Sequence, residues 1–401
     1  MLIVHKYGGT SVGSLERIDS VASRVAKARK EGNDIVVVVS AMSGETNKLI
    51  EFAKHFSANP SKREMDMLLS SGERVTASLL AIALNEQGVD AIAMTGRQVG
   101  IKTDSMHTYA RIESIDPSVM LLELEKGRVI VVAGFQGVNE DGAVTTLGRG
   151  GSDLSAVAIA GALKADACEI YSDVDGIYTT DPRIEPKAKK MDFISYDEML
   201  ELASLGAKVL QNRSVELAKK LNVKMIAKSS FSDAEGTVIG EEIEDMEKVL
   251  VSGIALDRNQ ARVTIREVAD RPGIAAEIFT KLAEEQINID VIIQNASADG
   301  RTNLGFTVSG CQIDQAKAVI ESFEHNIGSM DFDNSVCKVS VVGVGMKSHA
   351  GVAATAFSAL AKESINIEMI STSEIKVSMV IAEKYAELAV RTLHQTYNLD
   401  V

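Results

Sequence analysis

The fold is decided by Leu2-Ile3-Val4-His5-Lys6-Tyr7-Gly8-Gly9-Thr10-Ser11. Its short apolar run ends in a cation, two glycines and two hydroxyl side chains, and a helical pattern follows. Glycines let the backbone come close to an anion, and the N–H groups at a helix start point toward it. The lysine precedes the glycines, so this is not the phosphate loop in which lysine follows them. The stretch predicts strand, turn and helix, with either a phosphate site or an ordinary turn between them.

Up to about residue 230, apolar runs alternate with amphipathic segments. The runs are continuous and β-branched, as in strands buried on both faces of a parallel sheet. Repeated strand and helix predict an α/β sandwich, whose ligands gather at the carboxyl ends of the strands. The predicted strands cover residues 2–6, 35–40, 91–94, 129–134, 168–172 and 224–227, and the predicted helices include 14–30, 64–86 and 152–164.

The C-terminal part of the chain contains an internal repeat. Residues 273–290 match residues 351–368, and each copy lies between two predicted strands. Only two copies predict a pair of small α+β domains and not a solenoid. The acidic, apolar-poor stretch 232–247 is the predicted linker before them.

Composition bounds the class of protein. The chain has 401 residues, 45% of them hydrophobic, and a formal charge of −14. This length gives two or three domains with buried cores. An acidic chain without lysine or arginine runs argues against a nucleic-acid partner, because phosphate backbones bind basic surfaces. The apolar runs are strand-sized and no signal peptide pattern opens the chain, so we expect a cytoplasmic protein with no membrane partner.

Cysteine and histidine usage offers no metal site. Cys168, Cys311 and Cys337 are widely spaced among apolar neighbours. An odd number without a C-x-x-C pattern predicts buried, reduced thiols and not a disulfide framework or a metal centre. The six histidines have no metal-ligand spacing, so no metal-binding residues are predicted.

Two polar segments in the first half could hold a small charged substrate. The loop from Ser40 to Asn47 can donate to a carboxylate or a phosphate, or Ser43 can simply cap the next helix. Ser70-Ser71-Gly72-Glu73-Arg74 lies in a helical pattern, where a glycine costs about 1 kcal/mol relative to alanine. That glycine indicates close approach by another segment, and Glu73 is a candidate partner for an ammonium group.

Two further loops suit anions. Thr145-Thr146-Leu147-Gly148-Arg149-Gly150-Gly151-Ser152-Asp153 combines three glycines with an arginine that can grip a carboxylate. The polar stretch from Ser172 to Arg183 follows a buried strand and suits a nucleotide with its divalent cation, although Asp173 and Asp175 can also be turn residues. With Lys6, these loops favour a phosphoryl-transfer site, which requires positioning and charge neutralisation more than covalent chemistry.

Taken in series, these motifs resemble those of the monofunctional aspartokinases, in the same order. The resemblance rests on Lys6–Ser11, Ser40–Gly44, Gly72-Glu73, Gly134–Gly137, Thr146–Asp153 and Ser172–Arg183 and covers essentially the whole chain. It implies an amino-acid-kinase αβα sandwich with a mainly parallel sheet over residues 1–240, then two ferredoxin-like ACT domains over 248–328 and 335–401. The last strand is expected to pair back with the first ACT domain. Where many members have His-Pro, this chain has Gln211-Asn212.

The resemblance also implies an activity and its residues. The chain would transfer the γ-phosphoryl group of ATP to the β-carboxylate of L-aspartate, with Mg²⁺ carried by the nucleotide. The implied catalytic residues are Lys6, Arg149 and Asp153. Aspartate would be held by Ser40, Thr46, Glu73, Arg149, Gly150, Gly151 and Ser152. ATP would be held by Lys6, Tyr7, Gly8, Gly9, Ser11, Ser40, Ser172, Asp173, Tyr178, Asp181, Arg183, Lys208 and Val209.

By the same resemblance, lysine, threonine or both would inhibit the enzyme at the ACT domains, which would also join chains into a homo-oligomer. The implied effector residues are Asp270, Gly273, Ile274, Asn288, Ile289, Asp290, Gln294, Ser348, Val352, Asn366, Ile367 and Glu374. The alternatives are a glutamate, acetylglutamate or uridylate kinase of the same fold, and a non-catalytic amino-acid sensor. An internal start at Met246, giving a separate regulatory subunit, also stays open.

Overall fold

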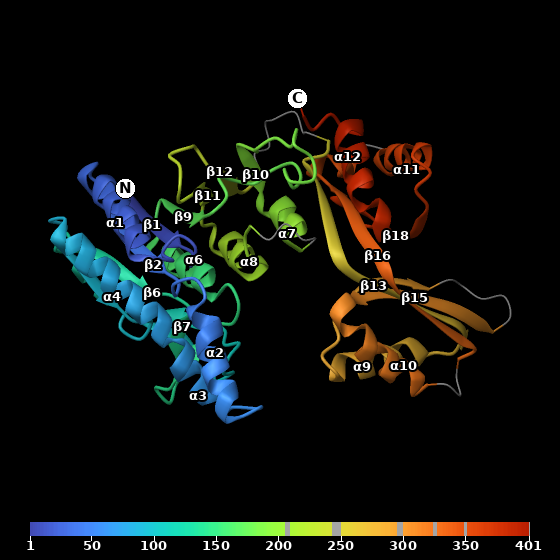
Figure 1. Cartoon of the computed structure of the whole chain (residues 1–401), viewed down its shortest axis with the longest axis horizontal. Helices are drawn as coiled ribbons and strands as arrows, with labels where there is room; N and C mark the ends of the chain where they lie inside the picture. Colours follow the sequence, from blue (N-terminus) through green and yellow to red (C-terminus); the bar gives the residue numbers. More distant parts are fainter. Residues whose placement is uncertain (205–208, 243–249, 295–299, 324–326, 349–350, 401) are drawn as a thin grey trace. The chain divides into compact units, whose positions relative to one another are not determined.

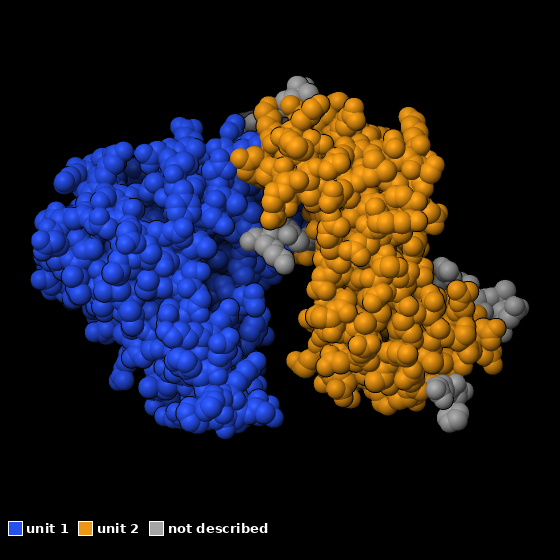
Figure 2. All heavy atoms as spheres, viewed as in Figure 1, with its two compact units in different colours: residues 1–177, 190–203, 208–245 blue, residues 178–189, 204–207, 246–401 orange. Residues whose placement is uncertain are grey.

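The computed structural model describes residues 1–204, 209–242, 250–294, 300–323, 327–348 and 351–400. The chain forms two compact units, which Figure 2 shows in blue and orange. Unit 1 consists of residues 1–177, 190–203 and 208–245. Unit 2 consists of residues 178–189, 204–207 and 246–401.

Unit 1 is built on an eight-stranded sheet (Figure 1). Its strand order is β10-β12-β11-β9-β1-β2-β6-β3, and every neighbouring pair is parallel except β11 with β12. This confirms the mainly parallel sheet, and the six predicted strands all lie in it. The strands are β1 (Leu2–Tyr7), β2 (Asp34–Val39), β3 (Ala91–Met94), β6 (Val129–Ala133), β9 (Ala167–Ser172), β10 (Phe193–Ser195), β11 (Met225–Ser229) and β12 (Thr237–Gly240).

Strand β12 corrects the predicted linker, which was wrong over residues 237–240. Thr237 and Ile239 are fully buried there. Their β-branched side chains suit a pleated, buried surface, and the acidic composition of the surrounding stretch concealed them.

Helices cover both faces of this sheet. Side chains of α1 (Leu15–Lys30) and α4 (Ser71–Glu86) join one core cluster with Ile35, Val37 and Val39 of β2. Successive strand residues point to opposite faces, so Val38 faces the other side. There it lies near Ser152 of α6 (Gly151–Leu163), which is buried along most of its length. The remaining helices of the first 230 residues are α2 (Glu45–Phe56), α3 (Lys62–Leu69), α5 (Ser118–Glu125), α7 (Tyr196–Ser204) and α8 (Asn212–Leu221).

The single helix predicted over residues 64–86 is two helices. The chain breaks at Ser70, between α3 and α4. Ser70 and Ser71 donate their hydroxyls to the carbonyls of Met67 and Leu68, and such local bonds compete with continued helix. The whole 62–86 stretch is long and apolar enough to cross a membrane, yet half of its apolar window is buried in the protein, which is the pattern of a core helix.

A small second sheet, absent from the sequence prediction, completes unit 1. Its order is β5-β4-β7-β8. The strands are only three or four residues long, too short for a recognisable alternation. They are β4 (Ile101–Thr103), β5 (Ile112–Ile115), β7 (Gln136–Val138) and β8 (Val144–Thr146). Strand β8 ends directly before the glycine-rich loop around Arg149.

Unit 2 contains one six-stranded antiparallel sheet of order β14-β15-β13-β16-β18-β17. Two cores lie on it, one lined by α9 (Ile274–Glu284) and α10 (Ile313–Glu321), the other by α11 (Val352–Lys362) and α12 (Ala386–Thr396). These are the two α+β halves that the repeat predicts. The strands are β13 (Gly253–Ala269), β14 (Ile289–Gln294), β15 (Arg301–Ser309), β16 (Ser329–Val342), β17 (Ile367–Thr372) and β18 (Lys376–Ala382).

The two halves share strands in a way that the sequence did not indicate. The start of β13 pairs with the end of β16, and Ile254 joins the core under α11 and α12. The later part of β13 pairs with β15 of the first half. The last strand, β18, pairs with β16 and β17, so it does not return to the first half as expected. The core under α11 and α12 includes apolar side chains from the start of β13. For this reason β13 is shared between the two halves.

The cysteine prediction needs one correction. All three thiols are free, and Cys168 and Cys337 are buried as expected, but Cys311 is exposed. It lies in a short 3-10 helix, Gly310–Gln312, at the end of β15.

Leu80→Ala tests the packing of α4 on the sheet. Leu80 is fully buried in the cluster that α4 shares with α1. Its truncation leaves a cavity, so we expect a loss of about 2–5 kcal/mol in the free energy of unfolding, measured by urea denaturation. Ile82→Ala, at a side chain 64% exposed on the same helix, is the matched control and should change stability little. Equal losses at both positions would contradict this packing.

Candidate functional site

Four polar segments meet at one edge of the large sheet. Strands β11, β9, β1 and β2 are consecutive neighbours and parallel, so their carboxyl ends lie together. The ladder continues past the strand ends: Gly8 N donates to Tyr171 O, Ser40 N to Tyr7 O, and Ser230 N to Ser172 O. This is the edge at which ligands bind in open α/β sheets. Ser40 and Ser172 were predicted there, and Ser230 was not.

The glycine turn after β1 is tightly fixed. Ser11 N donates to Gly8 O at 2.9 Å, and the Ser11 and Ser230 hydroxyls lie 2.5 Å apart. A side chain at Gly9 would place its Cβ 3.0 Å from the carbonyl oxygen of Ala41. Close packing at this turn therefore favours glycine. The Tyr7 ring is fully buried and stacks on Tyr171, with 4.7 Å between ring centres, so only the backbone of Tyr7 is available to a ligand.

Lys6 forms an ion pair with Asp153. The Lys6 Nζ lies 2.5 Å from Asp153 Oδ1, and their side chains are only 10% and 13% exposed. Lys6 ends the central strand β1, while Asp153 lies in the first turn of α6, where the helix dipole favours negative charge. The structure thus brings two of the three predicted catalytic residues together.

Glu73 is a buried carboxylate with one free oxygen. It is 4% exposed, and its Oε1 accepts from Ala41 N at 3.1 Å. Within the described part of the chain its Oε2 has no hydrogen-bond partner. Burial raises the pKa of Glu73 to about 7, against the lowering effect of the Ala41 N–H. A half-satisfied buried carboxylate suits an ammonium group of a ligand.

Gly72 explains how Glu73 reaches this position. A Cβ at Gly72 would lie 2.7 Å from the Cβ of Ala41, in the loop that leaves β2. The close approach predicted from a glycine in a helical pattern is therefore confirmed, and the approaching segment is the Ser40–Asn47 loop. In that loop, the N-cap of α2 is Gly44 in left-handed conformation, with no side-chain cap, so the capping role considered for Ser43 is wrong. Thr46 lies in the first turn of α2.

The Arg149 loop is braced through its backbone. Gly148 and Gly150 have positive φ angles of 80° and 72°, which favour glycine. Gln211 Nε2 donates to Arg149 O at 2.7 Å, and Arg213 donates to Leu147 O at 2.6 Å. The Arg149 side chain is exposed. Gly150 caps α6, and Gly151 and Ser152 form its first turn.

The stretch after β9 divides between the two units. Ser172 and the exposed Asp173 belong to unit 1, whereas Tyr178, Asp181 and Arg183 belong to unit 2. Asp181 pairs with Arg183 at 2.7 Å. Val209 lies in a turn of unit 1, and Lys208 lies outside the described residues.

Sequence reasoning missed the residues that act on the site through its backbone. Gln211 and Arg213 hold the Arg149 loop from a helix far along the chain, and no local pattern marks them. Ser230 could have been found, because it follows a predicted strand just as Ser40 and Ser172 do. The buried Asp66 of α3 was missed as well. It lay in a helical pattern, where a charged residue is ordinarily exposed.

In unit 2, the predicted effector residues occupy equivalent places in the two halves. Gly273 and Gly351 cap α9 and α11 with φ angles of 97° and 102°. Asp290 pairs with the buried Lys338, and its repeat counterpart Glu368 pairs with Arg262 at 2.8 Å. The other predicted effector residues lie at or near the ends of helices and strands of unit 2. They are Asp270 after β13, Ile274 and Val352 at the helix starts, Asn288, Ile289 and Gln294 at the ends of β14, Ser348 in a 3-10 helix, Asn366 and Ile367 at the start of β17, and Glu374 after β17.

Family comparisons match this division of the chain. Residues 1–229 match the amino acid kinase family, and residues 266–322 and 339–397 match an ACT domain. The chain is 60% identical to an aspartokinase of Helicobacter pylori over the full length of both proteins. It is 55% identical to an aspartate kinase of Pseudomonas putida, covering all of this chain and 98% of that one.

Solved structures show the same arrangement of the chain. E. coli aspartokinase III, in complex with aspartate and ADP in the R-state, superposes with a TM-score of 0.81 at 27% identity and 99% coverage of both chains. The same enzyme in complex with lysine and aspartate, in the T-state, gives 0.80 at 26% identity, again covering 99% of each chain.

Gly72→Ala tests the contact between α4 and the loop after β2. Alanine in a helix interior normally stabilises by about 1 kcal/mol relative to glycine. Here its Cβ would overlap Ala41, so we expect Gly72→Ala to lower the melting temperature. Ala41→Gly removes the overlapping Cβ, so the double variant should recover most of the loss. A stabilised single variant would show that α4 does not approach this loop.

Proposed function

This chain belongs to the aspartokinases of the amino acid kinase family, and we propose that Lys6, Asp153 and Arg149 form the centre of its reaction. It is an aspartate kinase, which transfers the γ-phosphoryl group of ATP to the β-carboxylate of L-aspartate to give 4-phospho-L-aspartate. This is the first step toward lysine, threonine and methionine. The observation that carries the assignment of the centre is the nearly buried Lys6–Asp153 pair at the carboxyl edge of the sheet.

Lys6 neutralises charge on the moving phosphoryl group. Phosphoryl transfer spreads negative charge over the equatorial oxygens, and an ammonium in a nearly buried place stabilises that charge more than it would in water. Asp153 holds the Lys6 ammonium at the strand end before ATP arrives. The phosphates then compete with Asp153 for Nζ, and the backbone N–H of Gly9 supplies a further donor, since that of Gly8 already donates to Tyr171 O.

Glu73 and Arg149 orient the acceptor. The free Oε2 of Glu73 receives the ammonium group of aspartate, and the exposed Arg149 guanidinium receives a carboxylate. Ser40 and Thr46 add hydroxyl donors from the loop that Gly72 packs against, and Gly150, Gly151 and Ser152 add the start of α6. In support, the E. coli relative was solved with aspartate and ADP bound.

The nucleotide lies on the β1–β9–β11 side of the edge. Its proposed contacts are Lys6, Tyr7 through its backbone, Gly8, Gly9, Ser11, Ser40, Ser172, Asp173, Tyr178, Asp181, Arg183, Lys208 and Val209. Mg²⁺ would be held mainly by the ATP phosphates and would neutralise their charge.

The full-length similarity to aspartokinases argues against the other kinases of this fold and against a non-catalytic sensor.

We keep 1–240, 248–328 and 335–401 as the proposed domain bounds, with the start of β13 contributing to the second ACT core. We also propose that the enzyme is cytoplasmic and forms a homo-oligomer through its ACT domains.

Feedback inhibition by lysine, threonine or both is the regulation we propose. The E. coli relative was solved with lysine in its T-state. In this chain the effector segments of the two halves each carry an acid, Asp290 or Glu368, whose partner lies on β16 or β13, the two strands that both halves share. An effector that alters these pairs changes both halves. Such coupling is typically worth about 1–3 kcal/mol.

Unit 2 also contains part of the proposed nucleotide segment. Ile254 N donates to Thr179 O at 2.7 Å, and Thr179 Oγ1 lies 2.9 Å from His394 Nε2 of α12. Arg391 Nε donates to Ile184 O at 2.8 Å. The segment that carries Tyr178, Asp181 and Arg183 is therefore fixed to the second ACT half.

One assay tests activity and regulation together. The enzyme is supplied with ATP, Mg²⁺ and L-aspartate, and the acyl phosphate is trapped with hydroxylamine, with lysine and threonine added singly and together. We expect aspartate-dependent hydroxamate that at least one of these additions suppresses. No hydroxamate would overturn the kinase assignment, and activity unaffected by all three additions would overturn the proposed regulation alone.

Lys6→Ala should lower kcat by about 10²–10³-fold, because a single charge-stabilising group in such a site has this effect. Removal of Lys6 alone leaves the nearly buried Asp153 carboxylate without its cation, which lowers stability. The double variant Lys6→Ala/Asp153→Asn removes that charge as well. A folded double variant with a low kcat would show that the loss of activity is not caused by unfolding. Lys27→Ala, at an exposed lysine on α1, is the control. A wild-type kcat in a folded Lys6→Ala enzyme would refute the role of Lys6.

The pKa of Glu73 predicts a pH dependence of aspartate binding. With the pKa raised to about 7 by burial, Glu73 is neutral below pH 7 and cannot balance the ammonium group of aspartate. The KM for aspartate should therefore fall by about tenfold between pH 6 and pH 8, while the KM for ATP stays nearly constant. In Glu73→Gln the KM for aspartate should be high at both pH values. A wild-type KM for aspartate that is equal at pH 6 and pH 8 would contradict the assignment.

A further inference from the structure

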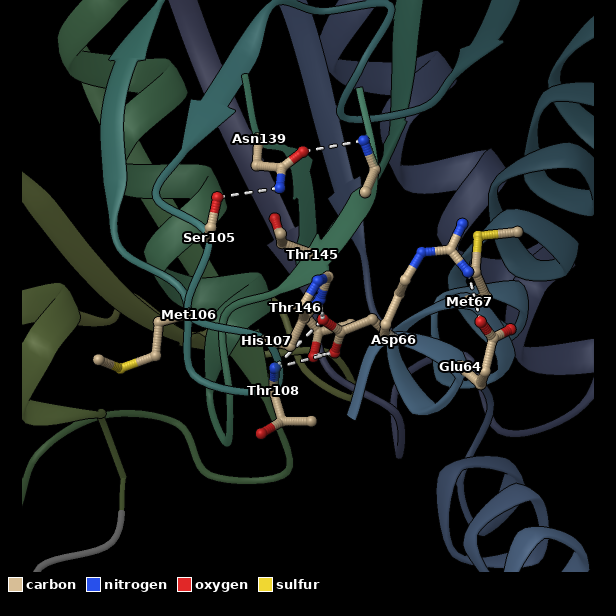
Figure 3. Close-up of polar contacts among 12 residues, drawn as sticks. Glu64, Asp66, Met67, Ser105, Met106, His107, Thr108, Asn139, Thr145 and Thr146 are labelled. Carbon is tan, nitrogen blue, oxygen red and sulfur yellow. Dashed lines mark hydrogen bonds and ion pairs between the residues drawn. The ribbon is translucent and has the colours of Figure 1, made fainter. Parts of the chain in front are cut away.

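Asp66 is a fully buried carboxylate that the proposed reaction does not use. It lies on α3, with no exposed surface. Figure 3 shows it directed at the loop around His107 and at the end of β8. Its Oδ2 lies 2.6 Å from His107 Nδ1, Thr108 N donates to both oxygens at 3.0 and 3.2 Å, and Thr146 Oγ1 donates to Oδ1 at 2.5 Å.

These bonds join two segments that bear the proposed acceptor-binding groups. The backbone carbonyl of Asp66 accepts from Ser70 N, and α4 with Glu73 begins at the next residue. On the other side, Thr146 is the last residue of β8, and the Arg149 loop follows at once. Asp66 therefore lies in the segment that precedes Glu73, and its buried side chain bonds to the segment that precedes Arg149.

The loop that supplies His107 and Thr108 supports the Arg149 loop as well. A Cβ at Gly148 would lie 2.7 Å from the ring of Tyr109. Arg213 donates to Leu147 O and, at 3.0 Å, to Ala110 O, and its guanidinium lies over the Tyr109 ring at 4.5 Å. Residues 107–110 and 147–150 are thus packed as one body. Asp66 bonds to the first part at His107 and Thr108, and to Thr146, which directly precedes the second part.

We propose that Asp66 is a positioning residue for the acceptor half of the site, and that it fixes the separation of Glu73 and Arg149. The inference rests on the proposed roles of those two residues. Buried polar networks of this kind are rigid when every member is satisfied, and misplacement of a binding group by about 1 Å can cost 10²-fold in rate. In the part of the chain that the structure describes, Asp66 bonds to Ser70, the 107–108 loop and β8, and its side chain has no bond to the glycine turn after β1. Its loss therefore acts on aspartate and spares ATP.

Thr146→Val is the decisive variant, because it removes one donor to Asp66 while it keeps the shape of the side chain. We expect the KM for aspartate to rise about tenfold, as for a lost hydrogen bond to a charged group, with the KM for ATP within about twofold of wild type. Thr146→Ser keeps the hydroxyl and should restore the wild-type KM for aspartate. Asp66→Asn should shift the KM for aspartate in the same direction as Thr146→Val.

Thr103→Val is the matched control. Thr103 is 2% exposed, and its hydroxyl lies 2.6 Å from that of Thr145, the neighbour of Thr146 on β8. This variant also loses a buried hydroxyl bond next to the loop, but none to Asp66, so the KM for aspartate should not change. Equal increases of that KM in Thr103→Val and Thr146→Val, or a parallel rise of the KM for ATP, would overturn the positioning role.

Hydrogen exchange decides the question without turnover. Peptides that cover residues 66–75 and 146–152 should exchange faster in Thr146→Val than in wild type or Thr103→Val, since Asp66 links both segments. Unchanged exchange in the 66–75 peptide would overturn the inference. Because exchange is measured on the resting enzyme, this result stands even if wild-type protein forms no aspartyl hydroxamate, an outcome that would instead overturn the proposed function.

Discussion

The ion pair between Lys6 and Asp153 is the interaction on which the site depends. It joins the end of the central strand β1 to the first turn of α6, in a place where both side chains are nearly buried. Because β1 has β2 and β9 as parallel neighbours, the loops that follow these strands are brought to the same ammonium group. Because α6 begins with the Arg149 loop, the acceptor side is brought there too. The order of the sheet and the start of α6 together give the proposed site two halves, one for each substrate.

Each half is held by a different kind of contact. Backbone hydrogen bonds beyond the strand ends and the close approach of Gly9 to Ala41 fix the nucleotide half. The proposed acceptor half relies on side chains from distant parts of the chain: the buried Asp66 and the half-buried Arg213 around the Arg149 loop, and the buried Glu73 with its free oxygen. In unit 2, β13 and β16 are shared by the two ACT halves. Arg262 of β13 and Lys338 of β16 form ion pairs with acids of the proposed effector segments. The proposed chemistry is therefore local, whereas the proposed control of it depends on long-range packing.

The parts of this protein that could be predicted from sequence are those with a local cause. Continuous β-branched runs marked six strands, the glycines after the first run marked a tight turn, and a glycine in a helical pattern marked the approach of α4 to Ala41. Three-residue strands such as β8 were missed because they are too short to show a period. The break at Ser70 depends on two hydroxyls, and the partition of β13 between two cores depends on a partner strand far along the chain. Asp66 was missed because only the fold shows that its carboxylate is buried.

We propose that Lys6 binds the nucleotide and Glu73 the acceptor at one edge of the sheet. A crystal structure of the chain with aspartate and a non-hydrolysable ATP analogue would test both roles at once. We expect Lys6 Nζ to leave Asp153 for a phosphate oxygen, and the aspartate ammonium to lie within hydrogen-bond distance of Glu73 Oε2. An ammonium bound elsewhere, or an unbroken Lys6–Asp153 pair with no contact to phosphate, would contradict it.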